Sequence, residues 1–275
     1  MESIKKIIEE RFNTTRLPNA QIQNRDDAEI FKREMLAGVE KIKKIEDSLN
    51  NKDALIMGLG PSLLDLDKQE YKNHVKLVCN HFYKVPDFFD KDFSPDYWCG
   101  ANSINMLGYP VKFCLEQDIR VFVTIPRKEE FYELVKIGEE TNKMDLFLGW
   151  MWEEQIFQRM LANKYNLKVT YSLCNTITNH MIALGLWLGC RSITITGFDL
   201  SYNQALKVKG ATHAGFTDEK ITNNHSKSGR FAFDDHSERQ QIIKDLKYFC
   251  SIAHDRGIKI ENLSHHINKL PKILA

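Results

Sequence analysis

Residues 54–63 read Ala-Leu-Ile-Met-Gly-Leu-Gly-Pro-Ser-Leu, a short apolar run that leads directly into a turn with two glycines. Such a run beside a glycine turn is typical of a buried parallel strand followed by a helix. Glycine lets the backbone approach a phosphate or ribose closely, and a helix N-terminus offers N–H donors to an anion. The stretch therefore predicts a nucleotide site with Gly58, Gly60 and Ser62 as candidate ligands. A tight turn without a ligand is the structural alternative.

The rest of the chain alternates apolar runs with helical segments. Strands are expected at residues 75–79, 95–99, 119–125, 192–196 and 258–262, and helices at residues 26–49, 181–189 and 237–256. Strands separated by helices imply βαβ units. We therefore predict an α/β fold, with a Rossmann-like and mainly parallel sheet flanked by helices.

The same pattern divides the chain into four segments. They are an N-terminal helical extension (1–52), a nucleotide-binding α/β domain (53–202), a lid (203–236), and a helix and strand that complete the domain (237–275). The lid segment is rich in polar residues and glycine, and long loops of this kind are usually functional. One apolar stripe runs along the extension, formed by Ala28, Phe31, Met35, Val39, Ile42 and Ile45. We expect it to pack on the main domain or on a second subunit.

Composition places the chain among soluble, cytoplasmic proteins. With 38 Lys+Arg and 37 Asp+Glu the net charge is +1, which provides no field that would attract nucleic acid. The longest apolar stretch, residues 181–190, has about half the length of a bilayer span. The first residues lack the apolar region of a signal peptide. Six cysteines without a CxxC pair are typical of buried free thiols in a reducing compartment.

Polar side chains follow two further predicted strands. Asn80 ends the second strand, and Gly197, Asp199 and Tyr202 follow the run at 192–196. Ligands of parallel sheets bind at the carboxyl ends of the strands, so these residues are candidates for a nucleotide site. Asn80 can bond a sugar or base edge, Asp199 can orient a ribose or an acceptor, and Tyr202 can donate to a leaving phosphate. Turn capping is the alternative for Asn80 and for Asp199.

A dinucleotide enzyme is disfavoured by the same residues. The dinucleotide fingerprint requires a third glycine where this chain has Leu63, and an acidic residue where it has Asn80. We therefore do not expect an NAD site at the glycine turn.

Histidines supply the candidates for a general base. His236 follows two aspartates and precedes the last predicted helix. A neutral imidazole beside a carboxylate suits proton abstraction near neutral pH. His213, His225 and His254 compete with His236 for this role.

Two Asp-x-Asp pairs, at residues 65–67 and 90–92, match the pattern by which many sugar transferases hold a divalent metal. Both lie in polar segments, where paired carboxylates are usually solvated, so we expect no metal site. The Ser-His-His run at 264–266 lacks further spaced ligands and is expected at the surface.

Three motifs follow one another in an order that resembles a known family. Gly-x-Gly-Pro-Ser-Leu starts at Gly58, Cys-Asn-x-Phe-Tyr starts at Cys79, and a Leu-Gly-Cys helix end at 188–190 leads to Gly-x-Asp at 197–199. The chain resembles the bacterial sialyltransferases of glycosyltransferase family 42 and the related motility-associated factor (Maf) proteins with their MptE-like domain. The match covers residues 53–263 and leaves the N-terminal helix outside.

This resemblance implies a modified GT-A fold and a CMP donor that carries a nonulosonic acid such as sialic, legionaminic or pseudaminic acid. It implies no metal requirement, so no cofactor is expected. Asn80 would contact the donor beside Gly58 and Gly60. Thr176 matches the threonine of the family's Thr-Ser pair, while isoleucine replaces the serine.

The resemblance also suggests the reacting side chains. The family's catalytic histidine stands in a His-Ser pair before the final helix, which His236 fits best, while His225 copies the local sequence farther upstream. The phosphate-binding tyrosine of the family aligns one place before Tyr202. The glycine-rich stretch at 210–215 is closer to the Maf pattern and places His213 along the site.

Together these features predict an inverting glycosyltransferase that moves a nonulosonic acid from CMP to the hydroxyl of a glycan, glycolipid or protein. A pyrophosphokinase of the MptE-like kind, which uses ATP and magnesium, is one alternative. A non-catalytic assembly protein is the other. The resemblance leaves room for peripheral contact with the inner membrane, because acceptors of such enzymes are often lipid-linked. A homo-oligomer would form through Phe31, Met35 and Val39.

Overall fold

The computed structural model describes residues 5–6, 8–10, 25–79, 82–84, 89–101, 111–124, 144–147, 156–167, 177–198 and 236–264. The chain forms two compact units. The first unit contains Met1–Ser48 and Cys99–Leu173, and the second contains Leu49–Trp98 and Cys174–Ala275. Both units are discontinuous in sequence. The linear division into four segments at residues 52, 202 and 236 stays a prediction.

The second unit is built on four parallel strands in the order β2-β1-β6-β7. Their bounds are Asp53–Met57 for β1, Val75–Cys79 for β2, Ser192–Thr196 for β6 and Lys259–Asn262 for β7. Ala54 lies opposite Val75 on one side and Ile193 on the other, and Ile193 lies opposite Ile260. The central strands are buried from their second residue onward, as expected for a parallel sheet covered on both faces.

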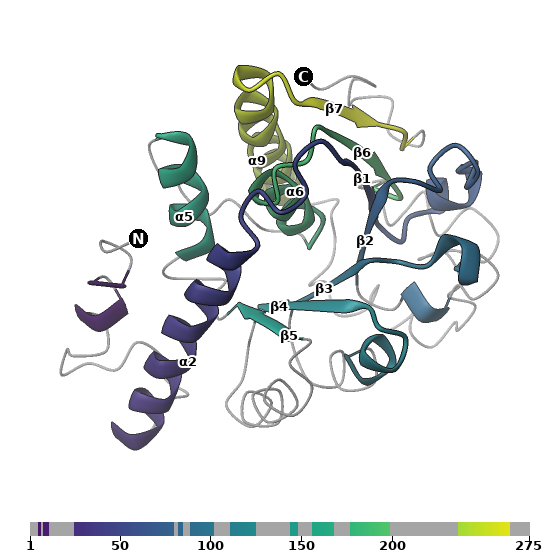
Figure 1. Ribbon diagram of the computed structural model, residues 1–275. Helices are drawn as coiled ribbons and strands as arrows, with labels where there is room; N and C mark the ends of the chain where they lie inside the picture. Colours follow the sequence, from purple (N-terminus) through teal and green to yellow (C-terminus); the bar gives the residue numbers. More distant parts are fainter. Residues whose placement is uncertain are drawn as a thin grey trace. The chain divides into compact units, whose positions relative to one another are not determined.

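Two helices pack on this sheet and on each other. The helix α6 (Ile177–Trp187) contacts β1 and β2, and α9 (His236–Asp255) contacts β7 and lies beside α6 (Figure 1). Every residue of α6 after Ile177 is buried, including the polar Thr178, Asn179 and His180, and from Met181 onward the helix is a continuous apolar run in the sequence. Gly185 of α6 allows a close approach to β6, because an added Cβ would lie 3.2 Å from the Ile193 side chain.

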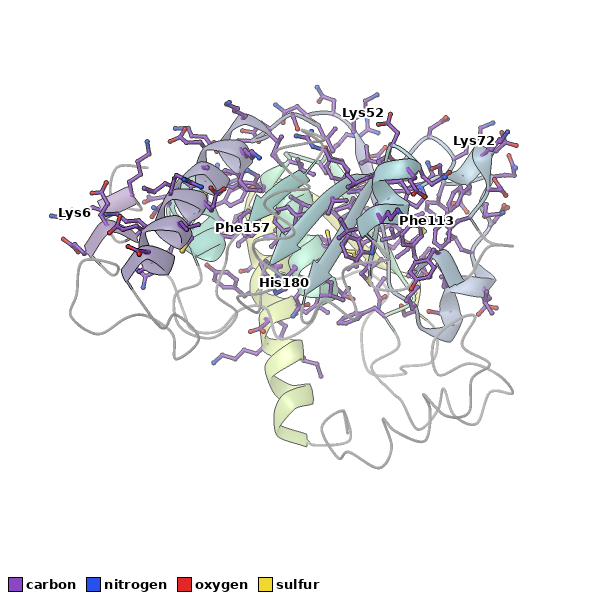
Figure 2. All side chains as sticks on the ribbon, turned by 90° about the horizontal axis from the view of Figure 1, so that it is seen from below. Lys6, Lys52, Lys72, Phe113, Phe157 and His180 are labelled. Carbon is purple, nitrogen blue, oxygen red and sulfur yellow. The ribbon has the colours of Figure 1, made fainter. Side chains whose placement is uncertain are left out.

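The first unit contains the strands β3 (Tyr97–Ala101), of which the last three residues belong here, β4 (Arg120–Thr124) and β5 (Met144–Phe147). Their order is β5-β4-β3, and β4 pairs with β5 in parallel. The helix α5 (Ile156–Tyr165) places Phe157 in the interior, where its ring centroid lies 5.7 Å from that of Phe122. Figure 2 shows Phe157 among neighbouring side chains, whereas Lys6 projects outward.

The N-terminal apolar stripe packs against other parts of the same chain. The helix α2 (Arg25–Lys44) contacts β5 of the same unit, and the stripe residues Ala28, Met35, Val39, Ile42 and Ile45 are all at most 5% exposed. The prediction that the stripe packs on the chain itself is therefore confirmed. Met35 and Val39 are covered within the chain and are not exposed for a dimer contact, whereas the side chain of Phe31 lies outside the described residues, so the homo-oligomer stays a prediction.

The end of α2 differs from the sequence prediction. The helix stops at Lys44, five residues before the predicted end at residue 49. Asp47 and Asn51 adopt positive φ angles of 55° and 66°, a conformation that ends helices and that aspartate and asparagine tolerate better than most residues. A salt bridge of 2.6 Å from Lys164 to Asp47 holds this turn within the first unit.

Five cysteines lie in the described part of the chain, namely Cys79, Cys99, Cys114, Cys190 and Cys250, and all five are buried free thiols, as predicted. Burial raises the pKa of Cys79 to about 12 and that of Cys250 to about 11, so both remain protonated at neutral pH. Cys174 lies outside the described residues.

The predicted α/β, Rossmann-like fold with a mainly parallel sheet is confirmed. The third predicted strand begins two residues late, because Asp96 forms a turn in which its carboxylate accepts from the Lys76 N–H at 2.8 Å. The short strand β5 and the helix α5 were not predicted. Within the described ranges, no helix has the length and apolar character that crossing a membrane requires.

Candidate functional site

Two glycines at the carboxyl ends of β1 and β6 lie backbone against backbone. A Cβ added to Gly58 would lie 2.3 Å from the carbonyl oxygen of Gly197, and a Cβ added to Gly197 would lie 2.2 Å from that of Gly58. Both distances are far shorter than real Cβ contacts. Because the atoms in the way belong to the backbone, they cannot move aside as the end of a flexible side chain could. Gly197 also has a φ of +67°, where residues with a Cβ are strained. The close contact of these strand ends therefore requires glycine at both positions.

Hydrogen bonds reinforce this contact. The Gly58 N–H donates to Thr196 O and the Gly60 N–H donates to Gly197 O, each at 2.8 Å. These two N–H groups are thus committed to β6. The predicted roles of Gly58 and Gly60 in substrate binding stay predictions, and at Gly58 the space that a side chain would take is filled by the backbone of Gly197.

The helix that follows the glycine turn is shorter than the sequence analysis assumed. Residues Pro61–Asp65 form the 3-10 helix η1, capped by the backbone of Gly60 without a side-chain hydrogen bond. A single turn of this kind carries little of the dipole that favours anions at the start of a long helix. An anion site built on a helix N-terminus is therefore not available here.

Ser62 is 2% exposed and faces β6. Its hydroxyl oxygen accepts from the Gly197 N–H at 3.0 Å, and its carbonyl accepts from the Thr196 hydroxyl at 3.1 Å. The residue is thus engaged with the neighbouring strand end, and its predicted role as a substrate ligand stays a prediction.

Ser264, which follows β7, also contacts the carboxyl end of β6. The sequence did not predict this residue as part of the site. Its hydroxyl accepts from the Phe198 N–H at 2.9 Å, and its own N–H donates to Asn262 Oδ1 at 3.1 Å. Ser264 is 7% exposed, so its assignment to the surface is wrong. Its place two residues after the last predicted strand was the available signal, since the carboxyl ends of parallel strands meet at one edge.

The structure brings together Gly58, Gly60, Ser62 and Gly197 of the predicted site. The other predicted residues Asn80, Thr176, Asp199, Tyr202, His213 and His225 lie outside the described residues, as does the lid segment before His236. Asn80 directly follows β2 and Thr176 directly precedes α6 in the sequence. His236 is the first residue of α9.

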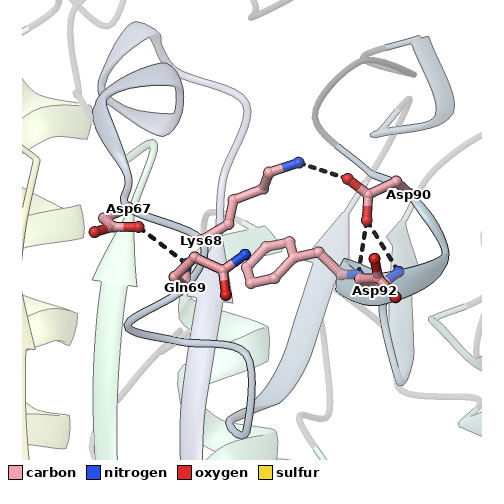
Figure 3. Close-up of polar contacts among 6 residues, drawn as sticks. Asp67, Lys68, Gln69, Asp90 and Asp92 are labelled. Atoms are coloured by element: carbon pink, nitrogen blue, oxygen red, sulfur yellow. Dashed lines mark hydrogen bonds and ion pairs between the residues drawn. The ribbon is translucent and has the colours of Figure 1, made fainter.

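The Asp-x-Asp pair at residues 90–92 stabilises a turn (Figure 3). The Asp90 carboxylate accepts from the N–H groups of Asp92 and Phe93, both at 3.0 Å, and from Lys68 Nζ at 2.7 Å. The Lys68 hydrogen bond lowers the pKa of Asp90. Asp67 of the other pair accepts from the Gln69 N–H at 3.0 Å. Among the described residues no group of three His, Cys, Asp or Glu side chains could hold a metal ion.

A cavity of about 310 Å³ lies at the opposite, amino ends of the strands of the second unit. Asp53, Ser192 and Lys259, the first residues of β1, β6 and β7, all line it. Asp53 accepts from Arg191 and, at 2.6 Å, from the Ser192 hydroxyl. The Arg191 hydrogen bond is the main cause that lowers the pKa of Asp53. Of the predicted site residues that the structure describes, none lines this cavity.

The sequence matches no protein-family model and no curated protein. The chain resembles sialyltransferases of known structure. The sialyltransferase CstII from Campylobacter jejuni in complex with cytidine-5'-monophosphate is 18% identical, with 78% of this chain and 81% of that chain covered and a TM-score of 0.46. A variant of CST-II in complex with CMP is 18% identical, with 82% and 88% covered and a TM-score of 0.48. At this identity the likeness concerns the path of the chain alone.

Proposed function

We propose that this chain is an inverting glycosyltransferase that moves a nonulosonic acid from a CMP donor to a hydroxyl of a glycan, glycolipid or protein. The observation that carries the proposal is the contact of Gly58 with Gly197. Two motifs of the family resemblance, far apart in sequence, meet there at one edge of the sheet. Parallel sheets bind nucleotides at this edge.

The proposed reaction is a single displacement at the anomeric carbon. The acceptor hydroxyl oxygen forms the new bond, the bond from that carbon to the CMP phosphate oxygen breaks, and CMP leaves from the opposite face. His236 takes the proton of the acceptor hydroxyl as general base. The Tyr202 hydroxyl donates a hydrogen bond to the departing phosphate, where negative charge develops.

The donor itself would be held by the strand ends. Asn80 and Asp199 contact the nucleoside, Thr176 and His213 line the sugar, and the glycine contact keeps the ends of β1 and β6 together beneath the nucleotide. The segment at 203–236 excludes water, which otherwise hydrolyses the activated sugar. We propose that no metal is required, and that the enzyme works in the cytoplasm or at the inner membrane surface when its acceptor is lipid-linked.

Nucleotide binding tests this proposal directly. Thermal unfolding would be followed with CMP, UDP and ATP, each with and without magnesium. A ligand that binds only the folded chain raises the unfolding midpoint by mass action, so CMP should raise it without magnesium. A magnesium-dependent shift with ATP alone would favour the pyrophosphokinase, and no shift with any nucleotide would favour the assembly protein.

The same protein then allows the base to be tested in a transfer assay with a CMP-activated nonulosonic acid. His236→Ala should lower kcat by about 100-fold or more, the range that a general base contributes, and leave CMP binding intact. Lys244→Ala is the control, because Lys244 lies on the same helix with an exposed side chain and is not a candidate base. Full activity of His236→Ala would reject the assignment and direct attention to His225 and His213.

A further inference from the structure

Two buried serines, one in η1 and one after β7, accept hydrogen bonds from successive N–H groups at the end of β6. Ser62, which follows β1, accepts from the Gly197 N–H at 3.0 Å. Ser264, which follows β7, accepts from the Phe198 N–H at 2.9 Å. The two hydroxyl groups therefore support the chain where it leaves the sheet, one from each neighbouring strand.

These contacts determine the path of the backbone for a simple reason. Beyond the last residue of a strand, N–H groups lose their partners in the sheet, and a buried N–H without an acceptor is costly. Gly197 and Phe198 are both buried, and the serine hydroxyl oxygens supply the missing acceptors. A backbone course that moves either N–H away from its serine would leave a buried donor unsatisfied.

Ser264 is itself held in place by two further bonds. Its N–H donates to Asn262 Oδ1 at 3.1 Å, and the N–H of its neighbour Leu263 donates to Ile195 O at 2.8 Å. The amide of Asn262, a buried residue of β7, thus orients the serine that holds Phe198. The carboxyl ends of β1, β6 and β7 are joined into one hydrogen-bonded edge.

We propose that Ser264 is a positioning residue for the donor-binding edge, which holds Gly197 and Phe198 in the course that nucleotide binding requires. This inference rests on the proposed function. Ser264 acts through the backbone of β6 and not by touching the donor, so its loss should affect donor binding selectively.

The test compares Ser264→Ala with Ser192→Ala. Ser192 lies at the amino end of the same strand, and its hydroxyl makes a comparable bond to Asp53 at 2.6 Å. Ser264→Ala should weaken CMP binding and raise the KM for the donor by about tenfold, with the acceptor KM unchanged. Ser264→Thr keeps the hydroxyl and should restore donor binding. Equal effects of Ser264→Ala and Ser192→Ala on both substrates would overturn the inference.

Amide hydrogen exchange separates this inference from the proposed function. The Phe198 N–H should exchange faster in Ser264→Ala than in the wild type and in Ser192→Ala, whether or not CMP binds. Unchanged exchange would reject the positioning role even in an active enzyme. Absence of CMP binding by the wild type would reject the proposed function and, with it, the link of this edge to a donor. If Ser264→Ala does not fold, Ser62→Ala applies the same test to the Gly197 N–H.

Discussion

At the scale of single residues, the contact between Gly58 and Gly197 is the most restrictive feature of the second unit. Two factors disfavour a side chain at these positions, crowding by the neighbouring backbone and a positive φ angle, and the two glycines differ in which of them apply. Gly58 lacks room, since the nearest atom to an added Cβ is a backbone oxygen at 2.3 Å. Gly197 lacks room and has a positive φ as well. Gly257 has the same φ of +67° but open space around an added Cβ.

These three glycines allow crowding and backbone strain to be measured separately. Gly257→Ala should lower the free energy of unfolding by about 1–2 kcal/mol, the cost of a Cβ in the left-handed region. Gly58→Ala should cost about 1–3 kcal/mol or more through crowding alone. Gly197→Ala should exceed both. Urea denaturation gives the three values, and a neutral Gly58→Ala would show that the strand ends can separate without cost.

At the scale of helices and strands, α2 is stabilised by packing its apolar stripe against a strand of the same unit. The stripe covers β5 of the first unit, while the exposed side of the helix carries lysines such as Lys43. The stability of the helix therefore depends on packing on β5 rather than on its own propensity.

Substitution on the two faces of α2 should have different effects. Ile42 is completely buried, so Ile42→Ala should lower the free energy of unfolding by about 2–5 kcal/mol through lost burial and a cavity. Lys43→Ala on the exposed face should change it by less than about 0.5 kcal/mol. Chemical denaturation measures both, and similar small values for the two variants would contradict the packing described for α2.

At the scale of the whole molecule, the balanced charge makes stability depend on individual buried groups rather than on net charge. His74 is the clearest of them, because its Nδ1 atom is buried without a hydrogen-bond partner and its ring packs edge-on against Tyr71 at 5.0 Å. Burial is the main cause that lowers the pKa of His74 below its usual 6.5, with Lys76 and Arg191 acting in the same direction and Asp53 opposing.

The lowered pKa of His74 predicts a loss of stability in mild acid. Above pH 6.5 the imidazole is neutral in the folded and the unfolded chain, and its contribution is fully present. As the pH falls through the folded pKa, the unfolded chain binds the proton more readily and is favoured. His74→Phe keeps the ring and removes the titration, so its urea midpoint should fall less than that of the wild type on acidification. Parallel curves for the two proteins would exclude His74 as the cause.

The sequence alone determined the positions of most strands and of the last helix, whereas α6 begins four residues before its predicted start at residue 181. The strands β1, β2 and β6 match the predicted runs to within one residue at each end, because apolar residues that recur in a short segment buried on both faces leave a clear local pattern. The helix α6 was recognised for the same reason. The strand β5 escaped prediction because four residues that include Asp145 do not stand out from their surroundings.

Only the tertiary structure decided which strand ends meet and which serines hold them. Ser62 and Gly197 are separated by 135 residues, and Ser264 and Phe198 by 66 residues. A hydroxyl that accepts from a distant N–H leaves no periodicity in the sequence, so Ser264 was assigned to the surface. The glycine turn was recognisable as a turn, but its close contact with Gly197 depends on the parallel pairing of β1 with β6, which long-range packing selects.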